Sequence, residues 1–191
     1  MFDKNVAKII FTGPVGAGKT TAINALSDTP VISTEQVATD DVKNRKEKTT
    51  VAMDYGMIKL ENGESIHLYG TPGQERFNFM WEILADNALG VIILVDNANE
   101  DPLRDLEFFL KSFKQFIENK AIVVGITRTD LAGSNKLDDY HKLLQKHGFN
   151  PPVFEVDGRK DKEICMLVQA LLFSVDQSMV EEPISDVAEK E

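Results

Sequence analysis

Residues 11–28 read FTGPVGAGKTTAINALSD and place three glycines and a lysine between an apolar run and a segment with helical spacing. Residues 13–20, GPVGAGKT, match the pattern G-x-x-x-x-G-K-[ST]. The strand-like run VAKIIF at 6–11 comes before the pattern, and a helix is expected at 19–28. A strand, a glycine-rich turn and a helix in this order predict a phosphate-binding loop in an α/β protein.

Each residue type in this loop has a chemical use. Gly13, Gly16 and Gly18 let the backbone wrap closely with its N–H groups pointing inward. Lys19 supplies a positive charge for the β- and γ-phosphates, and Thr20 offers a hydroxyl to Mg²⁺. A turn that only caps a helix is the alternative, but a glycine usage of about 7% makes the pattern a chance event in roughly one such chain in a hundred. The other nucleotide contacts predicted in the loop are Val15, Ala17 and Thr21.

The rest of the chain alternates strand-like and helical segments. Apolar runs rich in β-branched residues indicate the strands, and apolar residues every three or four positions indicate the helices. The expected strands are 6–11, 50–60, 64–69, 90–95, 121–126 and 152–156. The expected helices are 19–28, 77–87, 103–117, 136–147 and 161–178.

This alternation predicts an α/β fold with a six-stranded sheet and helices on both faces. The sheet is expected to be mixed, because Asn62-Gly63 is a hairpin signal between the strands at 50–60 and 64–69. The polar connection at 30–49 is of a length that is usually mobile or functional. We expect one domain at 1–178 and an acidic, disordered tail at 179–191.

The composition limits the possible partners. With 31 acidic and 21 basic side chains the net charge is −10, which repels nucleic acid and anionic lipid. The basic run at 43–48 is short and is expected to be a solvated loop. A single cysteine and the lack of a leader-like start favour the cytosol, and the longest apolar run, 88–95, is too short to span a membrane.

Two further motifs narrow the class. The stretch LYGTPGQERF at 68–77 resembles the D-T-A-G-Q-E-R-F segment of Ras-like small GTPases, and TVAMDY at 50–55 resembles the T-I-G-V-D-F of Rab-type members. Proline in TPGQ is most similar to bacterial Ras-like proteins, namely the gliding-motility polarity GTPases and the GTPases of actinobacterial conservon operons. The resemblance covers residues 5–175.

The resemblance implies a Ras-like P-loop domain that binds GTP/GDP with Mg²⁺ and hydrolyses GTP. Thr50 would place its hydroxyl on Mg²⁺ and its N–H on the γ-phosphate, while Gly73 would give that phosphate a second N–H. Gln74 would orient the attacking water and, with Lys19 and Thr50, complete the expected catalytic set. A plain strand residue at 50 and an exposed polar residue at 74 are the alternatives.

The expected base site departs from the family pattern. ITRTD at 126–130 stands where the family has N-K-x-D, so Asp130 could accept guanine N1–H and N2–H₂, while Thr127 and Arg128 replace the amide and the lysine. A turn residue is the alternative for Asp130. Gly158 and Arg159, in DGR at 157–159, occupy the place of the S-A-K loop, and the altered side chains there are expected to matter little.

Two other departures predict slow hydrolysis. Gly70 stands where most small GTPases have an Asp that holds Mg²⁺ through water, so Asp54 becomes a candidate carboxylate. Val15 replaces a glycine and could crowd Gln74. We therefore expect a switch protein whose slow turnover is accelerated by a partner.

The expected partners are proteins that bind the two switch segments. The resemblance makes a roadblock-fold protein one candidate. Trp81 with Phe77 and Phe79 is expected to pack the helix after the second switch, and these aromatics could also form a nucleotide-dependent partner surface. A nucleotide-binding scaffold with little or no hydrolysis is the first alternative. A small-molecule kinase is the second, but it lacks an Arg-rich lid and has no use for GQERF.

Overall fold

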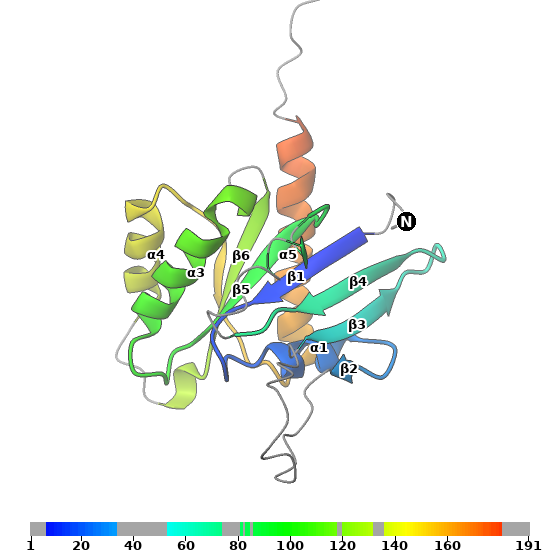
Figure 1. The fold of residues 1–191 in the computed structure, drawn as a ribbon, viewed down its shortest axis with the longest axis horizontal. Coiled ribbons are helices and arrows are strands. Elements are labelled where there is room, and N and C mark those ends of the chain that lie inside the picture. Colours follow the sequence, from blue (N-terminus) through cyan, green and yellow to red (C-terminus); the bar gives the residue numbers. More distant parts are fainter. Residues whose placement is uncertain are drawn as a thin grey trace, which may run out of the picture.

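The computed structural model describes residues 7–33, 53–73, 81, 83–84, 86–117, 120–131 and 136–180. Seven strands form one sheet in the order β2-β3-β4-β1-β5-β6-β7 (Figure 1). The strands are β1 Ala7–Thr12, β2 Ile32–Ser33, β3 Asp54–Lys59, β4 Ser65–Gly70, β5 Gly90–Asp96, β6 Ala121–Thr127 and β7 Val153–Glu155. The helices are α1 Lys19–Leu26, α3 Pro102–Ile117, the 3₁₀ turn η2 Thr129–Leu131, α4 Leu137–Lys146 and α5 Asp161–Val180.

The α/β fold with a mixed sheet is confirmed, but the expected number of strands is wrong. Six strands were predicted, and the additional one is β2, a two-residue strand that pairs antiparallel with β3. Its residues Ile32 and Ser33 are both exposed, so the segment has none of the apolar alternation that marks a half-buried strand. Helix α5 also continues to Val180, two residues beyond the predicted end.

The predicted hairpin is confirmed. Strands β3 and β4 pair antiparallel from Asp54 opposite Gly70 to Lys59 opposite Ser65. In the turn Gly63 has φ +87°, a conformation that glycine adopts without strain, and its N–H donates to the Leu60 carbonyl at 3.0 Å. The pairing of β1 with β4 and β5, and of β6 with β5 and β7, is parallel.

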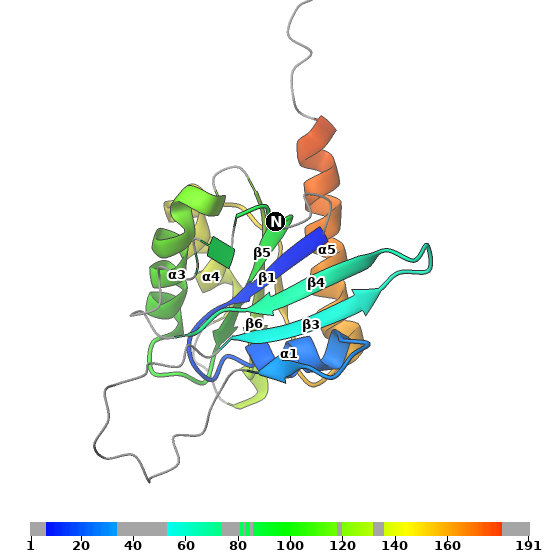
Figure 2. The ribbon, with the colours of Figure 1, turned by 45° about the vertical axis from the view of Figure 1, so that its right-hand side comes forward.

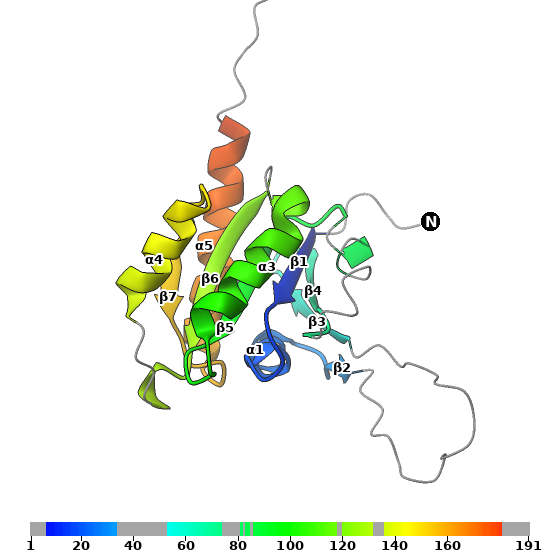
Figure 3. The ribbon, with the colours of Figure 1, turned by 60° about the vertical axis from the view of Figure 1, so that its left-hand side comes forward.

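Helices cover both faces of the sheet. Figures 1 and 3 show α3 and α4 on one face, while α5 lies behind the sheet and α1 lies beneath β3. Alternate residues of the central strands face the two layers: Ile10 and Ile93 pack under α3, and Ile9 and Phe11 pack under α1 and α5. Strand β5 is buried along its whole length, as expected for a central parallel strand.

Trp81 belongs to the core in this structure. It is 1% exposed, stacks on Phe113 with ring centroids 5.1 Å apart, and donates from Nε1 to the Pro72 carbonyl at 3.1 Å. The predicted packing role is therefore confirmed, whereas the part of Trp81 in a nucleotide-dependent partner surface stays a prediction. Phe77 and Phe79 lie outside the described residues.

The parallel strands direct their carboxyl ends to one edge of the sheet, and the glycine-rich loop and η2 lie at that edge (Figure 2). This is where ligands bind in open α/β sheets. Within the described ranges, no helix is both long enough and apolar enough to cross a membrane.

Candidate functional site

The glycine-rich loop is packed directly against the sheet. Gly13 has φ +136°, and a Cβ at this position would overlap the carbonyl oxygen of Leu94 on β5. Only glycine allows this close approach. Gly18, with φ +92°, is the N-cap of α1, so the helix begins at Lys19 as the sequence pattern predicts.

Lys19 is held inside the loop. Its side chain is buried, with 8% of the residue exposed, and its Nζ donates to the carbonyl oxygens of Gly13 at 2.7 Å and Pro14 at 2.6 Å. These bonds fold the loop around the ammonium group and fix the charge at the helix N-terminus. A fixed ammonium group beside a helix N-terminus attracts phosphate oxygens.

The segment after β4 lies against this loop. A Cβ on Gly73 would be 2.6 Å from the Val15 nitrogen and 3.0 Å from Lys19 Nζ. The segment is anchored next to Gly73, since the Thr71 N–H donates to the Phe11 carbonyl at 2.9 Å. The backbone of Gly73 and the ammonium group of Lys19 therefore meet at one place, although 54 positions separate them in the sequence.

A second anchor joins β4 to β1. The hydroxyls of Thr12 and Thr71 form a buried hydrogen bond of 2.8 Å at the carboxyl ends of the two strands. Val15, in contrast, is 65% exposed, so its side chain leaves the loop while its backbone faces Gly73. Crowding of Gln74 by Val15 stays a prediction, because Gln74 lies outside the described residues.

Thr20 has a carboxylate partner. Its Oγ1 donates to Oδ2 of Asp54 at 2.6 Å, and Asp54 is only 8% exposed. Asp54 pairs with Gly70 across the hairpin, and a Cβ on Gly70 would lie 3.1 Å from the same Oδ2. The Asp54 carboxylate therefore fills the space that is left open by the glycine at 70.

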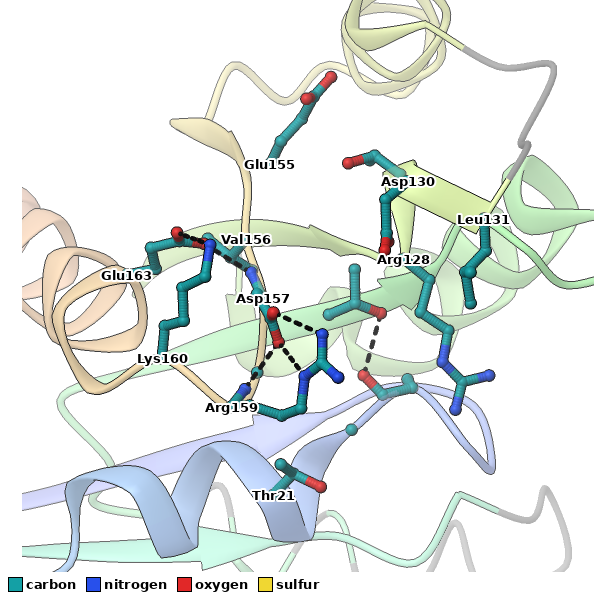
Figure 4. Close-up of a pocket in the computed structure, with 15 residues that line it drawn as sticks. Thr21, Arg128, Asp130, Leu131, Glu155, Val156, Asp157, Arg159, Lys160 and Glu163 are labelled. Atoms are coloured by element: carbon teal, nitrogen blue, oxygen red, sulfur yellow. Dashed lines mark hydrogen bonds and ion pairs between the residues drawn. The ribbon is translucent and has the colours of Figure 1, made fainter.

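A cavity of about 560 Å³ opens beside the loop (Figure 4). It brings together eight of the predicted nucleotide contacts, which come from the glycine-rich loop, α1, the segment from the end of β6 through η2, and the loop after β7. These residues are Ala17, Gly18, Thr21, Thr127, Arg128, Asp130, Gly158 and Arg159. The lining residues that sequence reasoning missed are Thr129, Leu131, Glu155, Val156, Asp157, Lys160 and Glu163.

Thr127 connects the cavity to the glycine-rich loop. Its buried hydroxyl donates to two backbone carbonyl oxygens, that of Ala17 at 3.2 Å and that of Val95 at 3.1 Å. The next residue, Arg128, has φ +55° and donates from Nη1 to Oδ2 of Asp96 at 2.8 Å. Asp96 is buried at the end of β5, and nothing in its sequence context signalled this pairing.

The loop at 157–160 is a network of charges. Arg159 donates from Nε and Nη2 to the two oxygens of Asp157, at 2.9 and 2.8 Å, and Lys160 donates to Glu163 at 2.8 Å. The hydrogen bonds from Arg159 hold the pKa of the Asp157 carboxyl well below its usual range. The Asp157 carboxylate, and to a lesser extent Asp130, raises the pKa of Arg159.

Two of the predicted catalytic residues, Thr50 and Gln74, lie outside the described residues, so their roles stay predictions. The predicted phosphate contacts at 13, 15, 16, 18, 19 and 20 lie together in the glycine-rich loop and the first turn of α1, and Gly73 is placed beside them. No group of three or more His, Cys, Asp or Glu side chains that could bind a metal by themselves occurs among the residues placed by the structure.

Comparisons with known proteins agree with this geometry. A solved small GTPase, Arl6/BBS3 from Trypanosoma brucei with bound GppNp, superposes with a TM-score of 0.65 at 17% identity, covering 91% of this chain and 99% of the other. In sequence, the Ras-related protein Rab-27A of Canis lupus familiaris is 25% identical over 171 residues, or 86% of this chain and 76% of its own. The human ADP-ribosylation factor-like protein 4C is 26% identical over 149 residues, covering 75% and 71%.

The fold is therefore that of a small GTPase, and the sequence is similar to those of Rab and ADP-ribosylation factor-like proteins. Residues 29–177 match the family described as "Conserved hypothetical ATP binding protein", and the chain belongs to that family. An uncharacterized protein of Methanocaldococcus jannaschii is 27% identical over 140 residues, which cover 72% of this chain and 80% of that protein.

Proposed function

We propose that this chain is a molecular switch that binds GTP and GDP with Mg²⁺ and hydrolyses GTP slowly. The observation that carries the proposal is the position of Gly73, whose backbone lies against Val15 and Lys19 in the phosphate loop. A terminal phosphate bound by Lys19 would be within reach of the Gly73 N–H, so the segment that begins at Gly73 would respond to the presence of that phosphate. Lys19, Thr50 and Gln74 are the proposed catalytic residues.

The proposed metal site uses Thr20 and Asp54, together with Thr50. The hydroxyl of Thr20 and the carboxylate of Asp54 lie 2.6 Å apart, and oxygens of this kind are the ligands that Mg²⁺ prefers. Bound Mg²⁺ would neutralise charge on the β- and γ-phosphates. Asp54 supports the proposal because it supplies from β3 the carboxylate that Gly70 lacks on β4.

Guanine is the proposed base. Asp130 lines the cavity, and its carboxylate has no hydrogen bond within the described residues, so it is available to accept guanine N1–H and N2–H₂. Adenine presents an acceptor at N1 and would leave Asp130 without that partner, at a cost of about 1–3 kcal/mol. The description of the family names ATP, which makes the base the first property to measure.

We further propose that partner proteins bind residues 31–50 and 70–82 and distinguish the GTP-bound from the GDP-bound state. A roadblock-fold partner and membership of the bacterial conservon or gliding-motility group are finer proposals, supported by the TPGQERF stretch at 71–77. A cytosolic location is proposed from the single cysteine, Cys165, which cannot form a disulfide within the chain.

A nucleotide-binding scaffold without hydrolysis is the second candidate. Two observations favour it: Gly70 replaces the usual metal-binding Asp, and the hydroxyl of Thr127 donates to backbone carbonyls and not toward a base. Both candidates bind nucleotide, but only the switch releases phosphate.

The decisive experiment has two steps. The nucleotide that copurifies with the protein is identified by anion-exchange chromatography, and phosphate release is then followed under single-turnover conditions with GTP and Mg²⁺. The switch proposal expects GDP or GTP in the protein and slow but measurable release that the Gln74→Ala variant loses. Copurified ATP would contradict the guanine assignment, and phosphate release no faster than in a protein-free control would favour the scaffold.

Val15→Gly tests the reason given for slow hydrolysis. If the isopropyl group crowds Gln74, its removal raises the single-turnover rate, and Val15→Ala gives an intermediate rate. Because Val15 is 65% exposed, neither substitution is expected to change the unfolding temperature. Unchanged rates in both variants would rule out crowding.

A further inference from the structure

The base cavity lacks an asparagine, and the structure shows what the replacement does. Thr127 directs its only hydroxyl hydrogen to the carbonyls of Ala17 and Val95, so it has none for a base. Asp130 offers only acceptors. The acceptor edge of a purine, which carries N7 and in guanine O6, therefore needs a donor from elsewhere in the cavity.

Arg159 has such a donor. Its Nε and Nη2 are bound to the two oxygens of Asp157, and no hydrogen bond to its Nη1 is found among the described residues. Figure 4 shows the guanidinium on the cavity side of Asp157, facing the region between Asp130 and Arg128. Nη1 carries two hydrogens, which is the number that O6 and N7 of guanine accept.

Arg159 is oriented by Asp157, although its side chain is 76% exposed. Two parallel hydrogen bonds to Asp157 orient the plane of the guanidinium, and the Arg159 N–H donates to the same carboxylate at 3.0 Å. Asp157 is held in turn, since its N–H donates to Oε2 of Glu163 at 2.7 Å. The pair is therefore an anchored donor at the rim of the cavity.

The other two cations of the cavity are engaged in different pairs. Lys160 donates to Glu163 at 2.8 Å, and Arg128 donates to Asp96 at 2.8 Å. The pairing with Asp96 draws Arg128 toward β5, whereas the pairing with Asp157 keeps Arg159 on the loop that also carries Gly158.

We propose that Arg159, positioned by Asp157, donates to the O6/N7 edge of a guanine base and so takes over the role of the missing amide. The inference rests on the proposed function, because it requires a purine bound through Asp130. In guanine, O6 is next to the N1–H group that Asp130 is proposed to accept from. A donor near Asp130 would therefore lie on the O6 side of the base. Adenine carries an amino group at position 6, whose hydrogens would face those of Nη1. Arg159 thus selects guanine over adenine.

The test measures Kd for GDP, 7-deaza-GDP and ADP by isothermal titration calorimetry in the full chain with Mg²⁺. For the unmodified protein we expect GDP to bind about tenfold tighter than 7-deaza-GDP, because N7 is lost, and more than tenfold tighter than ADP. Arg159→Gln is expected to weaken GDP about tenfold, to leave ADP unchanged, and to remove the difference between GDP and 7-deaza-GDP. Asp157→Asn, which releases Arg159, is expected to give a smaller loss of the same kind.

Lys162→Ala is the matched control. Lys162 is exposed three residues after Arg159 and does not line the cavity. Its substitution therefore removes one positive charge without removing a group that could contact the base. Equal weakening of GDP and ADP in Arg159→Gln would show that Arg159 acts only through charge on the phosphates, and would overturn the inference. Unchanged binding of GDP would also overturn it.

Different results would disprove the proposed function and the inference about Arg159. If the unmodified protein binds neither GDP nor GTP, the proposed function itself is wrong and the inference falls with it. If it binds GDP tightly but does not distinguish 7-deaza-GDP, only the inference is wrong. The second comparison uses the unmodified chain, so it does not depend on the folding of any variant.

Discussion

The two ends of the nucleotide site differ in how far they keep the family pattern. At the phosphate end Gly13, Lys19 and Gly73 lie as the motifs predict, and the backbone makes most of the site. At the base end side chains have been exchanged, and Thr127 and Arg159 form contacts that the family motifs do not contain. Where the backbone makes the site, the sequence pattern must persist, whereas side-chain sites tolerate replacement by other donors.

The same contrast applies to the proposed metal site at Thr20 and Asp54. Thr20 matches the family pattern, while the proposed carboxylate is Asp54 on the neighbouring strand and not a residue at position 70. This placement is possible because positions 54 and 70 are directly opposite in the hairpin. The chemistry can be preserved although the motif is not.

The largest effect is expected at the phosphate end. Lys19→Ala removes a buried charge that bonds to Gly13 and Pro14, and it should weaken GDP and ADP alike by about a hundredfold, or roughly 3 kcal/mol. Calorimetry measures this, with the exposed surface residue Lys111 as the control in Lys111→Ala. Tight binding by Lys19→Ala would show that the loop does not hold the phosphates.

The metal site should give the second largest effect. Asp54→Asn keeps the shape of the side chain but removes its charge, so the Mg²⁺ concentration that half-maximally slows GDP release should rise about tenfold. Release is followed with a fluorescent GDP analogue over a Mg²⁺ titration. Asp28→Asn, which alters a carboxylate that instead accepts from the Lys59 N–H, serves as the control. The same Mg²⁺ dependence in all three proteins would exclude Asp54 as a ligand.

A smaller effect, on stability, is expected at Thr127, which connects the base cavity to the glycine-rich loop. Thr127→Val removes the hydroxyl that bonds to Ala17 and Val95, and it should lower the free energy of unfolding by about 1–2 kcal/mol. Urea unfolding of the nucleotide-free protein measures the loss. Thr129→Val is the matched control, because the Thr129 hydroxyl makes no hydrogen bond within the described residues. Equal free energies of unfolding for the unmodified protein and Thr127→Val would mean that these hydrogen bonds do not contribute to stability.

The smallest effect concerns pH. The pKa of Asp157 is depressed by Arg159, so the stability that the pair adds is fully present above the ordinary value of 3.8 and is lost as the pH falls from there through the lower folded value. The difference in unfolding free energy between the unmodified protein and Asp157→Asn should therefore stay constant between pH 5 and 8 and shrink below pH 4. A difference that changes between pH 6 and 8 would contradict the pairing.

Much of the fold could be predicted because its signals are local. The glycine-lysine loop, the Asn62-Gly63 turn and the apolar runs of the central strands each depend on neighbouring residues. Strand β2 was missed because its two residues lie exposed at the edge of the sheet. Its formation depends on β3, which is remote in the sequence.

The site was predicted less completely than the fold, for a related reason. The pairing of Arg128 with Asp96 joins residues 32 positions apart, and no local pattern indicates it. The pairing of Arg159 with Asp157 did leave a signal, since the two charges are only two residues apart in DGR. The expectation that the side chains there matter little stays a prediction, and the Arg159 variants test it.

The central claim is that the terminal phosphate changes the conformation of residues 31–50 and 70–82. Amide hydrogen exchange of these two segments, compared between the GDP complex and the complex with a non-hydrolysable GTP analogue, tests it most directly. The account predicts stronger protection of both segments with the triphosphate, and the same protection in α5 with either ligand. Identical exchange of the two segments in both complexes would contradict the account, however tightly the nucleotides bind.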